Sequence, residues 1–491
     1  MLKLYNTLTK RIEDFKPLKD GEVRAYFCGP TVQDVPHIGH ARAFIAFDVL
    51  VRYLKFMGYK VYYIRNVTDI DDKIIKKANE LGVTTFEIAE TNYREFIFAM
   101  TKLKLLPPNI EPRATCHITE IIELIKRLID RGYAYVAPNG DVYFDVTKFE
   151  KYGKLSGQSL EALKAGARIE PGEHKRNPLD FALWKAAKPG EPSWPSPWGP
   201  GRPGWHIECS AMSIKYLGET FDIHGGGADL IFPHHENEIA QSESATGKPF
   251  AKYWFHVGLV NFKGDKMSKS IGNVVLVNEL LKIYDHETIR YWAISTHYRK
   301  PIEFSLRALD NAEKALDKIY QTIFELELLK ESKESGTISD NVNEFIKWLE
   351  KSFKDAMNDD INTPKALSIL HQATDKIKVM KGELNRDEIE KIIEKIRQLG
   401  WVLGILQQTF SERIEEKKKR KKEISSITPP NYPYRELENT KDLIELIVMV
   451  RSELRKMKMY DLADMIREKL RELGIRLEDT KDGTIWRIER I

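Results

Sequence analysis

The chain is short of cysteine and has no long apolar run. Its 491 residues include 3 cysteines, Cys28, Cys116 and Cys209, which lie far apart and are odd in number. This argues against a disulfide framework and favours a reducing compartment, so we expect a cytoplasmic protein. No stretch of about 18 consecutive apolar residues exists, which leaves no membrane span. The N-terminal residues 1–5 also lack the long apolar core of a signal peptide.

Excess charge of one sign is also small. The formal net charge is +4, which by itself does not indicate a nucleic-acid partner,. Its distribution is more informative, because residues 417–422 are all basic and come shortly before the pair Pro429-Pro430. This run fits either a solvated linker or an RNA contact, and both interpretations stay open. The length predicts three or more domains, and 42% hydrophobic residues are typical of an ordinary globular protein,.

An α/β fold is indicated by the order of the apolar segments. Between residues 22 and 112, short strand-like runs such as 23–27 and 61–64 alternate with helical patterns at 41–57 and 72–81. Alternation of this kind predicts a parallel sheet. A polar, Gly- and Pro-rich stretch ends near residue 200, and the α/β pattern resumes after it, so we expect an insertion into one fold.

The segment His37-Ile38-Gly39-His40 follows the first strand and a Gly-Pro turn and begins a helix. A helix N-terminus in this position binds anions, because its unpaired N–H groups and its dipole face the ligand. His37 and His40 can donate to phosphate oxygens, and Gly39 leaves room for a base or ribose near the backbone. These features predict one half of an ATP site.

The segment Lys266-Met267-Ser268-Lys269-Ser270 lies in a glycine-punctuated loop, so Lys266 and Lys269 can reach a phosphate chain. Either segment alone is a weak signal, since short peptides of this kind occur by chance. Together, and in this order, they predict an ATP-binding site. At this point the sequence resembles the class I aminoacyl-tRNA synthetases, whose two signature motifs these are.

Four residues of metal-binding type are Cys28, Cys209, His234 and Glu238. His234 and Glu238 share one face of a helix that we expect to begin after Pro233. Two thiolates, an imidazole and a carboxylate suit Zn²⁺, although the spacing alone is weak evidence because no C-x-x-C pair is present. The resemblance narrows here to the cysteinyl-tRNA synthetases, on segments such as 27–32, 65–73, 204–210 and 224–230. It implies that the four residues hold one zinc ion.

The resemblance also implies a reaction and its partners. The chain would activate L-cysteine with ATP and load it onto tRNA(Cys), with Mg²⁺ accompanying ATP. Four residues would be catalytic, His37, His40, Lys266 and Lys269, and these with Gly39 would bind ATP. Four others would bind or enclose the amino acid: Thr68, Trp205, His224 and Asp229. Zinc would select a thiol over the hydroxyl of serine, so we expect no editing domain, and we expect a monomer.

The nearest alternative is an ATP-dependent ligase that joins cysteine to an amino sugar on the same scaffold. A small-molecule ligase has no use for an RNA-reading tail, which discriminates the two. We therefore expect a Rossmann-like catalytic domain split by an insertion, then an α-helical bundle and a small mixed α/β C-terminal domain. The expected order is catalytic domain, first half, 1–112; insertion, 113–200; second half, 201–260; lysine loop and stem-contact region, 261–310; bundle, 311–410; basic linker, 411–435; and anticodon-binding domain, 436–491.

Overall fold

The computed structural model describes residues 1–158, 174–262, 265–266, 274–426, 447–448, 451–452, 455, 460–472, 475–480 and 483–488. The chain divides into two compact units, Met1–Lys421 and Lys422–Ile491. Among the described residues, no helix is both long and apolar enough to cross a membrane.

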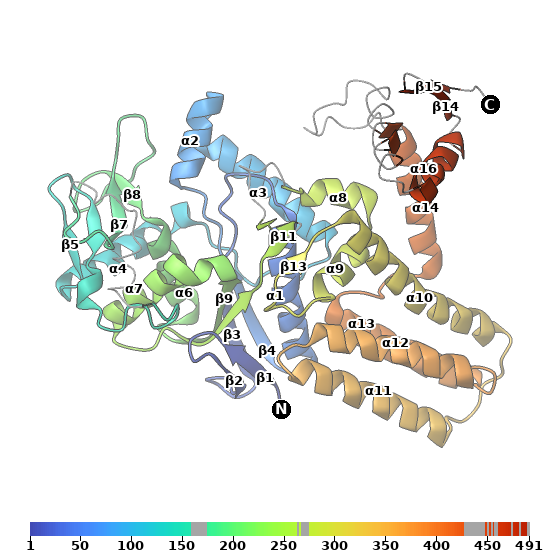
Figure 1. Cartoon of the computed structure of the whole chain (residues 1–491). Coiled ribbons are helices and arrows are strands. Elements are labelled where there is room, and N and C mark those ends of the chain that lie inside the picture. Colours follow the sequence, from blue (N-terminus) through green and yellow to red (C-terminus); the bar gives the residue numbers. More distant parts are fainter. Residues whose placement is uncertain are drawn as a thin grey trace. The chain divides into compact units, whose positions relative to one another are not determined.

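A four-stranded parallel sheet forms the centre of the first unit (Figure 1). Its order is β10-β9-β3-β4, and its strands are β3 (Glu22–Phe27), β4 (Lys60–Arg65), β9 (Phe221–Gly227) and β10 (Ala251–Val257). The helices of this fold are α1 (Ile38–Phe56), α6 (Trp205–Leu217) and α7 (Glu236–Thr246). The strands are mostly buried, as expected for a parallel sheet covered by helices,. The predicted Rossmann-like sheet is confirmed.

Between β4 and β9 the chain leaves this sheet and forms a second, antiparallel one of order β5-β6-β7-β8. The elements of this region are α2 (Asp72–Leu81), α3 (Thr85–Lys102), η1 (Ala114–Cys116), α4 (Ile118–Asp130), β5 (Ala134–Val136), β6 (Val142–Phe144), η2 (Val146–Lys148), β7 (Phe181–Ala186) and β8 (Gly201–Pro203). β3 and β9 nevertheless pair directly, so the two halves of the parallel sheet form one fold. A hairpin of β1 (Lys3–Asn6) and β2 (Arg11–Asp14) precedes it.

Gly29 lets the ends of two neighbouring strands converge. A Cβ atom added at Gly29 would lie 1.6 Å from the carbonyl oxygen of Asn66, so only glycine fits there,. The Gly29 N–H donates to Asn66 Oδ1 at 2.8 Å. Cys28 and Thr68, which follow the two strands, are thereby brought to the same edge of the sheet.

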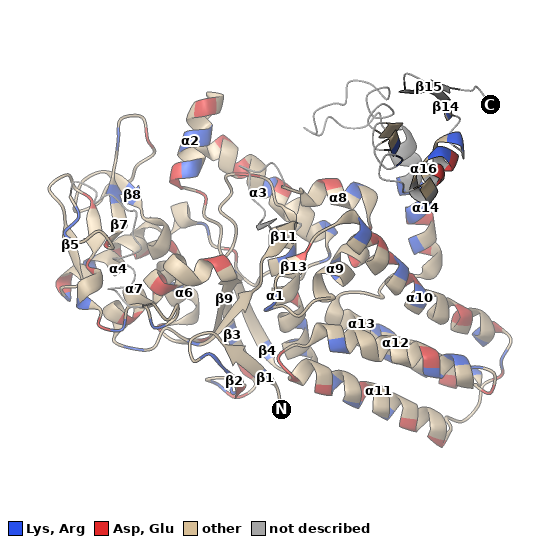
Figure 2. Cartoon of the chain, in the orientation of Figure 1, with Lys and Arg blue, Asp and Glu red and all other residues tan. Residues whose placement is uncertain are grey.

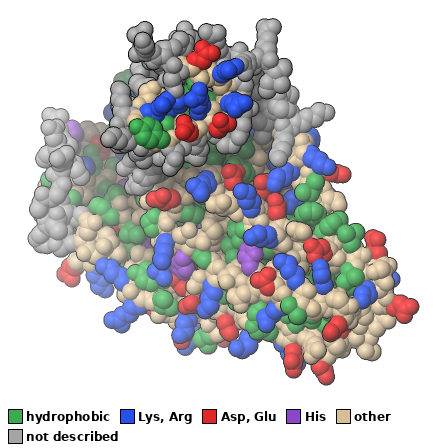
Figure 3. All heavy atoms as spheres, turned by 45° about the vertical axis from the view of Figure 1, so that its right-hand side comes forward, with side chains coloured by type: hydrophobic (Ala, Val, Ile, Leu, Met, Phe, Trp, Pro, Cys, Tyr) green, Lys and Arg blue, Asp and Glu red, His purple; other side chains and the backbone are tan. Residues whose placement is uncertain are grey.

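The part of the first unit after β10 is mostly helical. β11 (Val260–Phe262) pairs with β12 (Asp265–Lys266) and with β13 (Ile302–Glu303). Two short helices lie between these strands, α8 (Val277–Ile283) and α9 (His286–Ile294). The long helices of the predicted bundle follow (Figure 1): α10 (Leu306–Glu331), α11 (Asp340–Asn358), α12 (Thr363–Met380) and α13 (Arg386–Leu403). Acidic and basic residues are interspersed along the bundle helices (Figure 2), and Figure 3 shows acidic and basic side chains interspersed over one face of the molecule.

A further helix, α14 (Phe410–Ser426), occupies the first part of the segment expected as a basic linker. In the second unit, α16 (Tyr460–Glu472) precedes β14 (Ile475–Thr480) and β15 (Gly483–Ile488), which pair antiparallel. The side chains of β15, those of Trp486 and Arg487 included, lie outside the described residues.

We expect replacement of Asp48 by alanine to destabilise the first unit strongly. Asp48 is 3% exposed, and its Oδ2 lies 2.7 Å from Arg52 and 2.5 Å from Arg290. Removing the carboxylate leaves two buried cations unpaired, which typically costs about 3–5 kcal/mol. Urea unfolding followed by circular dichroism measures the loss. Asp375→Ala, which removes an exposed ion pair, is the control and should change the midpoint little,; equal effects would contradict the prediction.

Candidate active site and metal centre

A cavity of about 630 Å³ opens at the carboxyl ends of the parallel strands. Its lining includes Cys28 after β3, Thr68 after β4, Asp229 after β9 and Gly258 after β10. Ligands of open parallel sheets bind at this edge, because the loops that follow neighbouring strands converge there. Three expected ATP-binding residues at the start of α1 line the same cavity: His37, Gly39 and His40.

The two histidines stack at the N-terminus of α1. Their ring centroids are 3.8 Å apart, and the planes differ by 16°. The backbone N–H of His37 donates to His40 Nδ1 at 3.2 Å. A neutral His40 ring therefore carries its hydrogen on Nε2,. Burial lowers the pKa of His37 to about 4 and, with His37 nearby, lowers that of His40 far below its usual value. Both rings are therefore neutral donors near pH 7.

The expected lysines are only partly described. The backbone of Lys266 lies in β12, whereas its side chain and the whole of Lys269 lie outside the described residues. The chain just after this loop is paired with the start of α1, because Ile38 N–H donates to Val275 O at 2.9 Å. Val275, which comes shortly after the lysine segment in the sequence, therefore lies beside the histidine segment, as expected for a two-part ATP site.

The four candidate metal ligands come together, although Cys28 and Cys209 are 181 residues apart. Their ligand atoms all lie within 4.8 Å of one another. Cys28 Sγ is 3.8 Å from Cys209 Sγ and 3.6 Å from Glu238 Oε1. Glu238 Oε1 is 3.0 Å from His234 Nε2. Metal–ligand bonds of about 2.0–2.3 Å in a tetrahedron give edges of roughly 3.3–3.8 Å, so the set fits one small cation.

The local backbone differs slightly from the expected helix. α7 begins at Glu236. It is preceded by the 3₁₀ turn η3 (Ala228–Leu230) and then by a π-helical turn, η4 (Ile231–His235). His234 therefore lies on this turn and Glu238 in the first turn of α7. The contact between them at 3.0 Å is kept.

Protons are shared unevenly among the four side chains. Burial alone lowers the pKa of His234, but Glu238 and Cys209 outweigh it and raise this pKa to about 10. Burial likewise raises the pKa of Glu238, yet His224 and His234 bring it down to about 2. The Cys28 thiol donates to Cys209 and lowers its pKa to about 6, whereas burial raises the pKa of Cys28. The cluster therefore carries negative charge on Glu238 and Cys209, and a metal cation can bind there with release of the protons on Cys28 and His234,.

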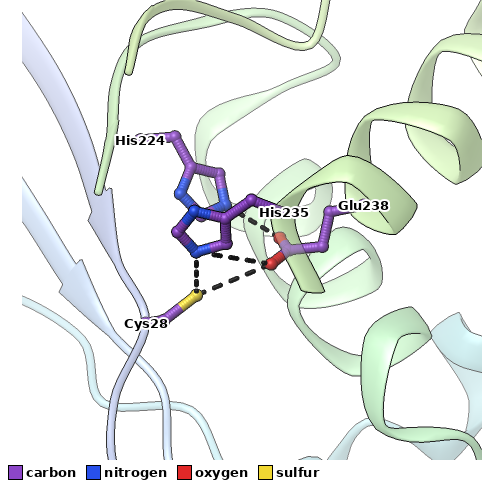
Figure 4. A group of neighbouring side chains, drawn as sticks. All are labelled: Cys28, His224, His235 and Glu238. Atoms are coloured by element: carbon purple, nitrogen blue, oxygen red, sulfur yellow. Dashed lines mark hydrogen bonds and ion pairs between the residues drawn. The ribbon is translucent and has the colours of Figure 1, made fainter. Parts of the chain in front are cut away.

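Two further histidines contact this group. Figure 4 shows His224 and His235 pointing toward Cys28 and Glu238. His224 Nε2 lies 2.8 Å from Glu238 Oε2, and His235 Nε2 lies 3.3 Å from Cys28 Sγ. Cys28, His224, His235 and Glu238 form a second possible ligand set. Because the two sets share Cys28 and Glu238, they are alternative ligand sets for a single ion.

Three of the four expected amino-acid-binding residues line the cavity, namely Thr68, Trp205 and Asp229. The Trp205 ring lies 4.2 Å from the His234 ring, centroid to centroid, and is 37% exposed. His224 is not in the lining. It is fully buried, stacks on Trp254 at 4.5 Å and contacts Glu238 instead.

Sequence reasoning missed several residues around the site. His206 Nδ1 lies 2.8 Å from His234 Nδ1, and Glu208 is hydrogen-bonded to Thr68 at 2.9 Å. His235 Nδ1 lies 2.8 Å from His256 Nε2. In the sequence, His206 and Glu208 lie just before Cys209, and His235 follows His234. Their closeness to a candidate ligand in the sequence could have indicated that they lie near the site. His256 comes from β10 and had no such indication.

Two family models match the chain. The model for the tRNA synthetases class I (C) catalytic domain matches residues 14–314, and the DALR domain model matches residues 352–407. The first match spans the parallel sheet, the antiparallel sheet and both segments expected to bind ATP. The second lies within the helical bundle.

Relatives match over nearly the whole length. The chain is 49% identical over 493 residues to a cysteine--tRNA ligase of Thermococcus gammatolerans, with 99% of both covered. It is 50% identical over 494 residues to one of Pyrococcus horikoshii, with the same coverage. The Mycobacterium tuberculosis methionyl-tRNA synthetase in complex with methionyl-adenylate shares the fold, with a TM-score of 0.61 and 15% identity over 84% of this chain and 99% of that one. The chain therefore belongs to the class I aminoacyl-tRNA synthetases, in the family of the cysteine--tRNA ligases.

Proposed function

We propose that the chain activates L-cysteine with ATP to cysteinyl-adenylate and transfers the cysteinyl group to the 3′ end of tRNA(Cys). The observation that carries this is one cavity lined by His37 and His40 and also by Cys28, Cys209 and His234. The names of the full-length relatives support the same reaction. The amino-sugar ligase has no such support, because the relatives that span 99% of the chain are named as tRNA ligases.

A zinc ion is assigned to Cys28, Cys209, His234 and Glu238. This set supplies two thiolates, which zinc prefers, whereas the overlapping set supplies one,. When bound, zinc supplies a soft Lewis acid that favours a thiolate over a hydroxyl group. His224 and His235 then act as outer partners, which orient Glu238 and Cys28 from outside the cavity,.

The chain's residues position the reactants rather than remove a proton. The carboxylate of the amino acid is already ionised near neutral pH, so its attack on the ATP α-phosphorus needs no base. His37 and His40 donate to phosphate oxygens at the start of α1, and Gly39 lets the nucleotide approach the backbone. Lys266 and Lys269 neutralise charge on the leaving pyrophosphate, and Mg²⁺ accompanies the ATP.

The amino acid lies between the ATP segment and the zinc ligands. Asp229 and Thr68 bind its amino group and backbone, and Trp205 covers the pocket near His234. The contact of Thr68 with Glu208 at 2.9 Å supports this, because it holds the hydroxyl in one orientation.

The other assignments follow from the same reaction. The distal helices and the β14–β15 hairpin read the anticodon of the tRNA, and zinc selectivity makes an editing domain unnecessary. The chain works as a monomer in the cytoplasm, where its three free cysteines stay reduced,.

Cysteine-dependent ATP–pyrophosphate exchange tests the proposal. We expect exchange with cysteine, and a kcat/KM for serine lower by about 1,000-fold or more, which corresponds to roughly 4 kcal/mol of differential binding. Removing the metal with a chelator should abolish cysteine activation, and added zinc should restore it. Equal activation of serine and cysteine, or full selectivity after the metal is removed, would refute the proposed selection.

A further inference from the structure

The basic run that left two interpretations open, residues 417–422, lies within α14 (Phe410–Ser426). Lys417 Nζ lies 2.8 Å from Glu313 and 3.3 Å from Asp317, both on α10. Arg420 Nη2 lies 3.8 Å from Asp285, just before α9. These basic side chains therefore face acidic groups of the first unit, and they attach α14 to α9 and α10.

Arg413 is the buried centre of this attachment. Its side chain is 1% exposed, and its Nη1 lies 2.7 Å from Asp285 Oδ1. Its Nε donates to Asp317 Oδ1 at 2.8 Å, and its Nη2 donates to Thr288 Oγ1 at 3.2 Å. A buried pair of this kind holds its partners firmly, because separating them leaves a charge without compensation in a poorly solvated place.

Asp285 also determines where α9 begins. Its Oδ1 accepts from Glu287 N at 2.9 Å and from Thr288 N at 3.1 Å, and so caps the helix,. Burial alone raises the pKa of Asp285, but the Arg413 guanidinium outweighs it, and the net pKa is lowered. One ionised carboxylate therefore joins α14 to the corner between α8 and α9.

The other end of α8 lies at the ATP site. Val277, the first residue of α8, donates from its N–H to Pro36 O at 3.0 Å, and Ile38 N–H donates to Val275 O at 2.9 Å. Residues 274–277 are therefore bound to the segment that carries His37. They also follow the lysine loop directly in the chain, so the position of α8 constrains where that loop ends.

We propose that Arg413 is a positioning residue for adenylate formation. Acting through Asp285, it holds α8 in place. Residues 274–277, which are hydrogen-bonded to the histidine segment, are thereby held in place as well. This inference rests on the proposed function. It assigns to the helix that leads to the second unit a task in ATP binding, which needs no tRNA.

The test measures cysteine-dependent pyrophosphate exchange by the full-length, zinc-loaded chain and its Arg413→Met variant. We expect the KM for ATP to rise about three- to thirtyfold, the range for coupling through a packed network, while the KM for cysteine stays unchanged. Arg413→Lys keeps the positive charge but loses the planar guanidinium that contacts Asp285 and Asp317 at the same time. It should therefore give an intermediate KM for ATP,. If Arg413→Met fails to fold, as thermal unfolding and zinc content will report, the lysine variant decides.

Lys417→Met is the matched control, because Lys417 is a basic residue of the same helix whose ion pairs, among the described residues, are with Glu313 and Asp317 of α10. It should leave both KM values unchanged. An unchanged KM for ATP in the Arg413 variants, a parallel rise in the KM for cysteine, or an equal effect of Lys417→Met would overturn the inference. Absence of exchange in the unaltered chain would overturn the proposed function and this inference with it.

Discussion

Replacing Cys209 by serine is expected to remove the bound metal and cysteine activation together. Cys209 Sγ lies 3.8 Å from Cys28 Sγ in a buried cluster, and its pKa of about 6 favours the thiolate, chiefly because Cys28 donates to it. A serine hydroxyl of nearly the same shape stays protonated and is a poor zinc ligand. Outer partners of a metal contribute roughly 10–100-fold to affinity or activity, and a direct ligand should exceed this. Elemental analysis and pyrophosphate exchange measure both losses.

Cys116→Ser is the matched control, because Cys116 is exposed and belongs to neither ligand set. It should keep full metal content and exchange activity. A Cys209→Ser protein that binds no zinc but activates cysteine normally would show that the metal does not select the substrate. A protein that keeps its zinc would show instead that this residue is not a ligand.

The fold was predictable wherever local pattern decides structure. Apolar runs of strand length alternating with helical periodicity led to the parallel sheet, and the loss of that pattern after residue 112 led to the insertion. The convergence of Cys28 and Thr68 was not readable in the same way. It depends on Gly29 lying against Asn66, which is a contact between strand ends.

The proposed ligand set could be named from the sequence only with the help of the resemblance. Cys28 and Cys209 are 181 residues apart, so their residue types suggest a metal but their spacing cannot place them together. The histidines around this set, such as His235 and His256, were even harder to predict from the sequence. His256 lies opposite Gly226 in the register of β10 and β9, and the His235 ring lies against Gly226, so this contact depends on a register that only the folded sheet fixes,.

Charge runs show the same limit. Lys417 belongs to a run of six basic residues, which favours exposure or an RNA partner when it is read alone. Its acidic partners, Glu313 and Asp317, lie about one hundred residues earlier on another helix. Composition shows how many charges there are, but pairing across helices is decided by packing.

Replacing His40 by asparagine is expected to impair adenylate formation without loss of metal. The neutral His40 ring accepts from the His37 N–H through Nδ1, so its only hydrogen is on Nε2,. An asparagine amide oxygen can take the place of Nδ1 and keep the contact with His37, but the side chain is too short to replace Nε2. Removing one donor that faces developing charge typically costs about 100- to 1,000-fold in kcat.

His40→Gln makes the complementary change, because its amide nitrogen can reach the position of Nε2, and it should retain much more exchange activity than His40→Asn. Both variants should keep their zinc, since His40 belongs to neither ligand set. The pKa of His40 is far below its usual value because the ring is buried and His37 is close. In the unaltered chain its ring therefore stays neutral from pH 6 to 8, so the ratio of kcat between the unaltered chain and His40→Asn should not change over that range. Equal kcat values for His40→Asn and the unaltered chain would show that the ring donates nothing to the reaction, and the phosphate contact would then have to come from His37 and the backbone alone.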